Sequence, residues 1–100
     1  MLVKFNNSYL EKLFTGEPVK GKPRYSTVVI EKFKKTILIL NNVSSSVELS
    51  KFKSLNFEAL KGDKKGLYSV RVNDAYRLEF KILKDIIEIV HIEQLSNHYK

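Results

Sequence analysis

The clearest pattern of hydrophobic and polar positions lies in the C-terminal half of the chain, where the two kinds of residue alternate from Leu67 onward. A period of two is typical of strands that bury one face of a sheet. The alternation covers three segments, Leu67–Val72, Ala75–Ile82 and Ile86–Ile92, joined by short polar turns. We therefore predict three strands that follow one another as an antiparallel meander.

The N-terminal half begins with a short apolar run, Leu2–Phe5, which predicts a further strand. Asn7 or Ser8 can then cap a helix that continues to about Phe14, because both side chains accept hydrogen bonds from a first helical turn. Gly16 stands where a helix commonly ends, since glycine adopts the left-handed conformation without strain. The chain thus opens with a strand and a short helix.

A loop and a second, longer helix are expected next. Gly16–Pro23 contains two glycines and two prolines, which indicate a loop. Tyr25–Leu40 fits two patterns, because its β-branched runs would also suit strands. Its apolar residues make a helical stripe, formed by Val29, Phe33, Ile37 and Leu40. The uninterrupted length of the segment exceeds that of a typical strand, so we predict a helix.

The middle of the chain is polar. Asn41–Ser46 is a break, and Ser45 followed three residues later by Glu48 forms a capping-box pattern for a short helix through about Phe52. Ser54–Gly66 is polar and contains glycine, which predicts an ordered loop. The expected fold class is α+β: a single domain over residues 1–100, with a small, largely antiparallel four-stranded sheet and two to three helices packed on one face.

The first hairpin of the meander decides which face its arginines occupy. A two-residue turn would place arginines on the core face, which a half-buried sheet should reject. A three-residue loop, Asn73-Asp74-Ala75, pairs Val70 with Leu78 and sets Arg71 opposite Arg77 on the other face. Like charges opposite each other destabilise a ladder. Either an anion held between the two guanidinium groups or an ion pair with Glu79 would offset that repulsion.

Composition adds a basic character to this picture. The chain has 100 residues and a net charge of +7. Such an excess suits a polyanionic partner, because each neutralised phosphate releases counterions. A basic protein without such a partner, or one that meets an acidic protein, fits the charge almost as well. The charge alone therefore favours a nucleic acid only modestly.

Several kinds of chemistry are not expected. Cysteine is absent, and the two histidines, His91 and His98, lack the spacing of metal ligands, so we expect no metal site and no cofactor. Charged and polar residues interrupt the N-terminal segment, which therefore has the pattern of neither a signal peptide nor a membrane span. We expect a cytoplasmic protein that has no membrane partner.

A longer motif is more specific than the charge. Leu60–Asn73 (LKGDKKGLYSVRVN) resembles the LKGD-x-x-G-x-[YW]-S-[IV]-x-V-N segment of HigB-type toxins, which belong to the RelE superfamily. Tyr76–Phe80 (YRLEF) is similar to the [YW]-R-[LI]-x-F strand of the same family. These matches cover about a quarter of the chain. The N-terminal half resembles the family only in its order of strand and helices.

The resemblance implies a toxin of a type II toxin–antitoxin system that cleaves mRNA on the ribosome without a metal. In that reaction the ribose 2′-hydroxyl attacks the adjacent phosphate while a general base removes its proton. A general acid protonates the departing oxygen, and arginines stabilise the charge that develops on the phosphate. The implied partners are a cognate antitoxin protein, the ribosome and mRNA.

The resemblance also implies roles for single residues. Glu58 stands where the related YoeB-type toxins carry a glutamate, and Arg77 matches the arginine of the family strand. His98 and Tyr99 look like the His-Tyr that ends YoeB-type chains. The implied catalytic residues are thus the base Glu58, the acid His98 and Arg77, while Lys61, Lys64, Lys65, Arg71 and Tyr99 would bind substrate. HigB-type chains often have histidine at the position of Glu58 and end in Asp-Tyr-His, and this chain departs from both patterns.

Other interpretations remain beside these roles. Glu58 could be a loop carboxylate paired with Lys61 or Lys64, and His98 could belong to a frayed terminus. A different function is that of a ParE-like toxin, which shares the fold but inhibits DNA gyrase by protein binding. Because an arginine on the polar face contributes little packing, replacement of Arg77 by alanine should abolish cleavage with little loss of stability.

Overall fold

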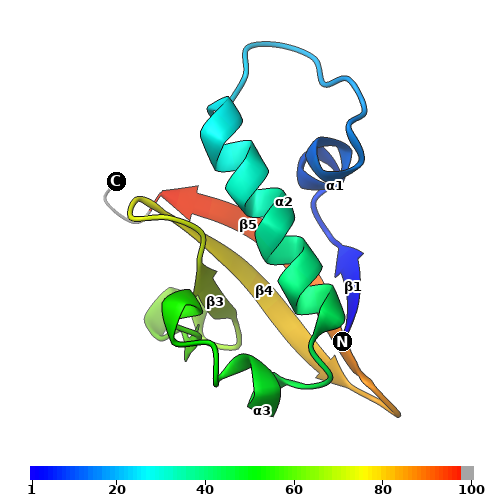
Figure 1. The fold of residues 1–100 in the computed structure, drawn as a ribbon, viewed down its shortest axis with the longest axis vertical. Helices are drawn as coiled ribbons and strands as arrows, with labels where there is room; N and C mark the ends of the chain where they lie inside the picture. The colour runs from blue at the N-terminus through cyan, green and yellow to red at the C-terminus, as the bar shows by residue number, and fades with distance from the viewer. Residues whose placement is uncertain (98–100) are drawn as a thin grey trace.

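A five-stranded sheet carries the fold, with the strand order β1-β5-β4-β3-β2 (Figure 1). The protein's structure is a computed structural model, which describes residues 1–97. The strands are β1 (Leu2–Phe5), β2 (Glu58–Ala59), β3 (Tyr68–Arg71), β4 (Tyr76–Lys84) and β5 (Glu88–Asn97). Neighbouring strands are antiparallel except for β1, which runs parallel to β5 at one edge. The α+β class and the meander predicted from the sequence are confirmed.

The sheet has one strand more than predicted, because part of the expected loop 54–66 pairs with β3. Glu58 lies opposite Ser69 and Ala59 opposite Tyr68. The backbone N–H of Leu60 donates to the carbonyl of Leu67 at 2.8 Å and extends this contact. A strand of two residues is too short to show a period of two, so the sequence pattern could not reveal it.

The last strand continues beyond its predicted end at Ile92 because of a β-bulge. Phe80 of β4 lies opposite Ile92, whereas Glu79 lies opposite Gln94, so Glu93 is the extra residue. The bulge shifts the alternation by one position and turns Leu95 into the core, where it is buried. The alternation of hydrophobic residues along β5 is therefore interrupted at Glu93, although the strand continues to Asn97.

The first helix, α1 (Ser8–Thr15), begins and ends as its sequence indicates. The side chain of Asn7 accepts a hydrogen bond from the N–H of Leu10 at 3.1 Å, so Asn7 is the cap. Gly16 ends the helix in the left-handed conformation, with a φ of 82°. A residue with a side chain would be strained there.

The ambiguous segment is the long helix α2 (Thr27–Asn42), which confirms the helical prediction. The hydroxyl of Ser26 caps it by accepting a hydrogen bond from the N–H of Val29 at 3.2 Å. All the residues of the predicted stripe are buried, namely Val29, Phe33, Ile37 and Leu40. Burial of one continuous stripe explains why the segment forms a helix in spite of its β-branched residues.

The third helix, α3 (Ser46–Leu49), is shorter than the predicted one, which was to reach Phe52. Ser45 accepts a hydrogen bond from the N–H of Glu48, as in a capping box. The carboxylate of Glu48, however, accepts from the backbone N–H of Ser44 at 3.1 Å. Two short 3₁₀ helices follow, η1 (Lys53–Leu55) and η2 (Gly62–Lys64).

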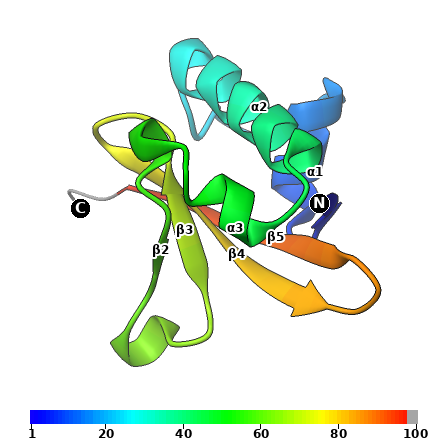
Figure 2. The same cartoon turned by 60° about the horizontal axis from the view of Figure 1, so that its bottom comes forward.

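The core lies between the sheet and the helices α1 and α2, which cover one face of it (Figure 1). The sheet contributes buried apolar side chains, namely Val70, Val72, Leu78, Phe80, Val90, Ile92 and Leu95. The opposite face carries Arg77 and Glu79, and the segment with β2 and η2 reaches away from the helices beside β3 (Figure 2). Within residues 1–97, none of the helices has both the length and the apolar character to cross a membrane.

Glu88 joins α3 to the sheet and should make stability depend on pH. Its carboxylate accepts two hydrogen bonds from Ser46, one from the backbone N–H and one from the hydroxyl, both at 2.7 Å. These bonds lower the pKa of Glu88 below its usual value. A lowered pKa in the folded state contributes stability above the pKa of an unfolded glutamate, and this contribution is lost as the pH falls through the folded value.

We expect Glu88→Gln to lower the free energy of unfolding by roughly 1–2 kcal/mol at neutral pH, the range for a hydrogen-bonded charged group that is partly exposed. The loss should shrink below about pH 4. Urea unfolding at several pH values measures both effects, with Glu31→Gln on the exposed side of α2 as the control. A pH-independent loss would contradict this role of the carboxylate.

Candidate functional site

The hairpin between β3 and β4 has the predicted register. Arg71 lies opposite Arg77 and Val70 opposite Leu78. The side-chain oxygen of Asn73 accepts hydrogen bonds from the N–H groups of Ala75 and Tyr76, at 2.9 and 2.7 Å, and so closes the three-residue loop. The two arginines therefore start from the same face of the sheet, opposite the core.

Arg77 is held rigidly on this face. Its side chain is buried, with 8% of the residue exposed. Nε donates to the hydroxyl of Ser69 at 2.9 Å and Nη2 to the carbonyl of Asn56 at 2.7 Å. Asn56 turns its carbonyl toward the guanidinium from a left-handed conformation with a φ of 45°, which asparagine tolerates better than most residues. Hydrogen bonds at Nε and Nη2 thus fix the orientation of the guanidinium group.

Glu58 lies beside this guanidinium. Its Oε1 is 3.5 Å from Nη2 of Arg77, and about half of the Glu58 side chain is exposed. Both residues line a hollow of about 290 Å³ on the open face of the sheet. Strand β2 positions Glu58, because its pairing with Ser69 sets it next to the residue that Arg77 contacts. A fixed cation and an accessible carboxylate therefore share one opening.

A second ion pair forms the opposite wall of the hollow. Glu79 is 4% exposed and accepts hydrogen bonds from Nζ of Lys64 and from the hydroxyl of Ser96, both at 2.7 Å. Lys64 comes from η2, in the turn that connects β2 to β3. Glu79 thus bonds Lys64 rather than an arginine, and Lys64 pairs with Glu79 rather than with Glu58.

The structure separates the other proposed substrate-binding residues from this hollow. Arg71 is exposed, forms an ion pair with Asp74, and lines a different hollow beside Lys32 and Lys35 of α2. Because Arg71 and Arg77 line different hollows, the geometry does not favour an anion held between them. Lys61 and Lys65 are exposed on either side of η2, outside the lining of the Arg77 hollow.

His98 and Tyr99 lie outside the residues that the structure describes. They follow Asn97 directly, and Asn97 lines the Arg77 hollow together with Ser96. Their roles as general acid and as substrate-binding residue stay predictions.

The hollow suits anion binding and proton transfer. Arg77 presents a planar guanidinium group, and its hydrogen bonds hold that group in one orientation. The planar array of N–H donors matches the oxygens of a phosphate. Glu58 can accept a proton from a group bound next to it. Within residues 1–97, no cluster of histidine, aspartate and glutamate could hold a metal ion.

Sequence reasoning did not single out three of the residues that hold the site. Ser69 and Asn56 orient Arg77, and Ser96 binds Glu79. Ser69 was visible in the motif, because its position on the polar face follows from the strand alternation next to Arg71. Asn56 and Ser96 gave no such signal, since their contacts depend on the β2 pairing and on the β5 bulge.

Several solved bacterial structures, a toxin and a toxin–antitoxin complex among them, share this architecture. The YoeB/ParE toxin from Agrobacterium tumefaciens matches with a TM-score of 0.59 at 18% identity, over 99% of this chain and 100% of that one. YafQ from Escherichia coli strain BL21(DE3) matches with a TM-score of 0.62 at 19% identity, over 97% of this chain and 92% of that one. The RelBE2 toxin–antitoxin complex from Mycobacterium tuberculosis gives 0.50 at 14% identity, over 97% of this chain and 96% of that one. At such identities these matches show a shared fold and nothing about function.

The family follows from the sequence itself. A model of the family described as "RelE-like toxin of type II toxin–antitoxin system HigB" matches residues 3–94, nearly the whole chain. No curated relative matches the chain. The chain belongs to the HigB-type family of RelE-like toxins, as the motifs around LKGD and YRLEF indicated.

The Lys64–Glu79 pair should be important for stability, because loss of the lysine leaves a buried carboxylate with one hydrogen-bond donor fewer. We expect Lys64→Met to lower the free energy of unfolding by roughly 1–3 kcal/mol. Lys65→Met, one residue further along and exposed, should change it by less than about 0.5 kcal/mol. Urea unfolding of both variants makes the comparison, and equal small effects would show that Glu79 needs no cation.

Proposed function

We propose that this chain is a metal-independent, ribosome-associated mRNA endonuclease, acting as one domain and as the toxin of a toxin–antitoxin pair. The observation that carries this proposal is the pairing of the buried, hydrogen-bonded Arg77 with the accessible carboxylate of Glu58 in one hollow. Membership of the HigB-type family supports it.

In the proposed reaction the scissile phosphate binds at Arg77. Among residues 1–97, the hydrogen bonds of the guanidinium use Nε and Nη2, which leaves Nη1 for a phosphate oxygen. Because Ser69 and Asn56 already fix the guanidinium plane, little reorganisation is needed when charge builds up on the phosphate. Preorganised donors of this kind are among the largest contributions to catalysis.

Glu58 then acts as the general base. It removes the proton of the ribose 2′-hydroxyl, whose oxygen forms a bond to phosphorus while the bond from phosphorus to the 5′-oxygen breaks. The departing oxygen takes a proton from a general acid, for which His98 has a suitable side chain. The products are a 2′,3′-cyclic phosphate and a 5′-hydroxyl end, and neither an oxidant nor a metal is needed to balance the step.

We propose two kinds of partner. One is mRNA on the ribosome, which the net charge of +7 favours. The other is a cognate antitoxin, which should be acidic where it meets this basic protein, because like-charged surfaces repel. The solved RelBE2 relative is itself a toxin–antitoxin complex.

The proposal predicts that purified protein cuts mRNA on ribosomes, with new 5′ ends mapped by primer extension. Glu58→Gln should lower the cleavage rate by roughly 10²–10⁴-fold, because it removes the proton acceptor. Arg77→Lys should lower it by roughly 10²–10³-fold, because a lysine keeps the charge and loses the planar fork. Glu31→Gln on α2 should cleave like the wild type. Cleavage should persist in EDTA once ribosome integrity is controlled.

Arg77→Ala is a poor test by itself. The burial of Arg77 and its hydrogen bonds correct the expectation that its loss has little structural effect. Thermal unfolding should therefore accompany each activity measurement. Full cleavage by folded Arg77→Lys and Glu58→Gln would show that the site is elsewhere. Inhibition of gyrase without any cleavage of mRNA would favour the ParE-like function instead.

A further inference from the structure

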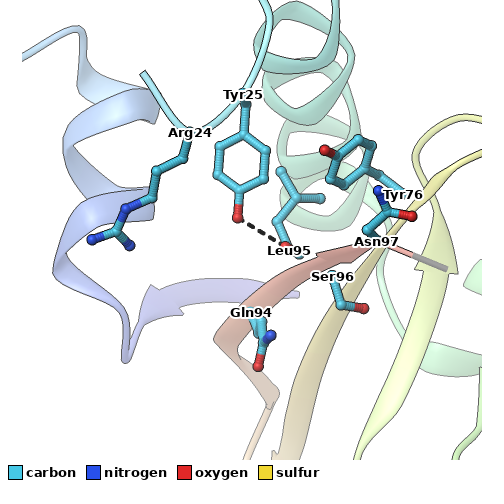
Figure 3. A pocket seen from close by; sticks show the side chains of 7 residues that line it. All are labelled: Arg24, Tyr25, Tyr76, Gln94, Leu95, Ser96 and Asn97. Carbon is cyan, nitrogen blue, oxygen red and sulfur yellow. Dashed lines mark hydrogen bonds between the residues drawn. The ribbon is translucent and has the colours of Figure 1, made fainter. Parts of the chain in front are cut away.

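A second hollow lies next to the proposed nuclease site, on the other side of the end of β5. It has a volume of about 260 Å³, and Ser96 and Asn97 line both hollows. The remaining lining comes from the loop before α2, which contributes Arg24 and Tyr25, and from the sheet, which contributes Tyr76, Gln94 and Leu95. Figure 3 shows these side chains around the last residues of β5.

Two aromatic rings form a corner of this hollow. The rings of Tyr25 and Tyr76 are 5.5 Å apart between centroids and stand at 74° to each other. The hydroxyl of Tyr25 donates to the carbonyl of Leu95 at 2.8 Å, which fixes the ring over β5 (Figure 3). Burial raises the pKa of Tyr25, so this hydroxyl stays protonated and keeps donating. A flat group that lies along one ring would meet the edge of the other.

The polar side chains that line the hollow carry hydroxyls, amides and one guanidinium group, and belong to Tyr25, Tyr76, Ser96, Gln94, Asn97 and Arg24. Asn97 lies opposite Tyr76 in the sheet, so its amide, a group that can donate and accept hydrogen bonds, starts on the side of the two rings. Gln94 lies opposite Glu79, and its amide points to the other side of β5 (Figure 3). The guanidinium of Arg24 lies 4.2 Å from the centroid of the Tyr9 ring, on the side of α1. None of the lining residues named for this hollow is a carboxylate.

We propose that this hollow binds one nucleobase of a single-stranded RNA, next to the phosphate bound at Arg77. Aromatic rings that stack and amides that read a base edge are the groups that recognise unpaired bases. The volume lies below the roughly 300–1,000 Å³ of typical pockets for drug-sized ligands, so it suits a single ring system. An acidic peptide would need several cations, whereas Arg24 is the single cation among the lining residues that the structure describes.

The position of the hollow gives it a role in specificity. Because Ser96 and Asn97 line both hollows, the two hollows adjoin at the end of β5, and we expect an RNA whose phosphate binds in one to place a neighbouring base at the other. Binding of that base would set which phosphate reaches Arg77 and Glu58. This inference about sequence preference rests on the proposed nuclease function, whereas base binding by the hollow does not require it.

The test therefore measures binding without ribosomes. The probe is a short single-stranded RNA with 2′-O-methyl riboses, which cannot be cut by attack of a 2′-hydroxyl. Its affinity is followed by the tyrosine emission of the protein, which contains no tryptophan. Each base is removed in turn by an abasic nucleotide. For the wild type, one removal should weaken binding by roughly 5–150-fold, the range for a stacked base.

The same removal should have less than about a twofold effect in Tyr76→Leu and a reduced effect in Tyr25→Phe, whose ring is no longer fixed by the hydrogen bond to the carbonyl of Leu95. Asn42→Ala, exposed at the end of α2, is the matched control and should behave like the wild type. Circular dichroism confirms that the variants are folded.

Two results would overturn base binding: no saturable binding of the RNA, or equal effects of every abasic position in the wild type and Tyr25→Phe. Competition by an acidic peptide that depends on Arg24 would assign the hollow to a protein partner instead. Ribosome assays separate the two proposals. Arg77-dependent cleavage without base dependence would remove only the base site, and base-dependent binding without cleavage would remove only the nuclease.

Discussion

Central strand β4 must bury both of its faces, and this requirement organises the molecule. Leu78 and Phe80 point into the core, while Arg77 and Glu79 between them are buried on the opposite side. Two opposite charges out of water are costly unless each finds hydrogen-bonding partners. Each neighbouring strand supplies one, since Ser69 of β3 binds Arg77 and Ser96 of β5 binds Glu79.

The segment between α3 and β3 supplies the remaining hydrogen-bonding partners of these two buried charges. It brings the carbonyl of Asn56 to Arg77 and the ammonium of Lys64 to Glu79. The same path carries Glu58 past the guanidinium, where it pairs with Ser69 at the edge of the sheet. The proposed catalytic carboxylate is thus positioned by interactions whose first effect is to neutralise buried charge.

Much of the fold could be predicted because its signals are local. The alternation in β3 and β4, the stripe of α2 and the left-handed Gly16 each depend on residues close in sequence. The missed features are non-local. Strand β2 exists only because β3 offers it an edge, and the extension of β5 depends on a bulge opposite β4.

The site divides in the same way. The hairpin register, and with it the position of Arg77, followed from the rule that arginines avoid the core face. The same rule does not predict that Arg77 is buried and bonded to the carbonyl of Asn56. Nor does it predict that Arg71, directly opposite, is exposed and pairs with Asp74. The alternation of residues along a strand predicts on which face of the sheet a side chain lies. The segments that pack on that face determine how exposed the side chain is to water.

Charge balance separates the proposed site from the rest of this basic protein. The charged residues lining the Arg77 hollow are Glu58, Lys64, Arg77 and Glu79, two of each sign, so the excess of +7 lies elsewhere. The excess can attract a polyanion over the whole surface, an effect that salt weakens. Inside the hollow a phosphate must instead compete with Glu58 for Arg77, and a bound phosphate therefore meets the carboxylate that would remove a proton from the adjacent ribose. Under the proposed function, attraction to RNA and selection of one phosphate thus depend on different residues of the chain.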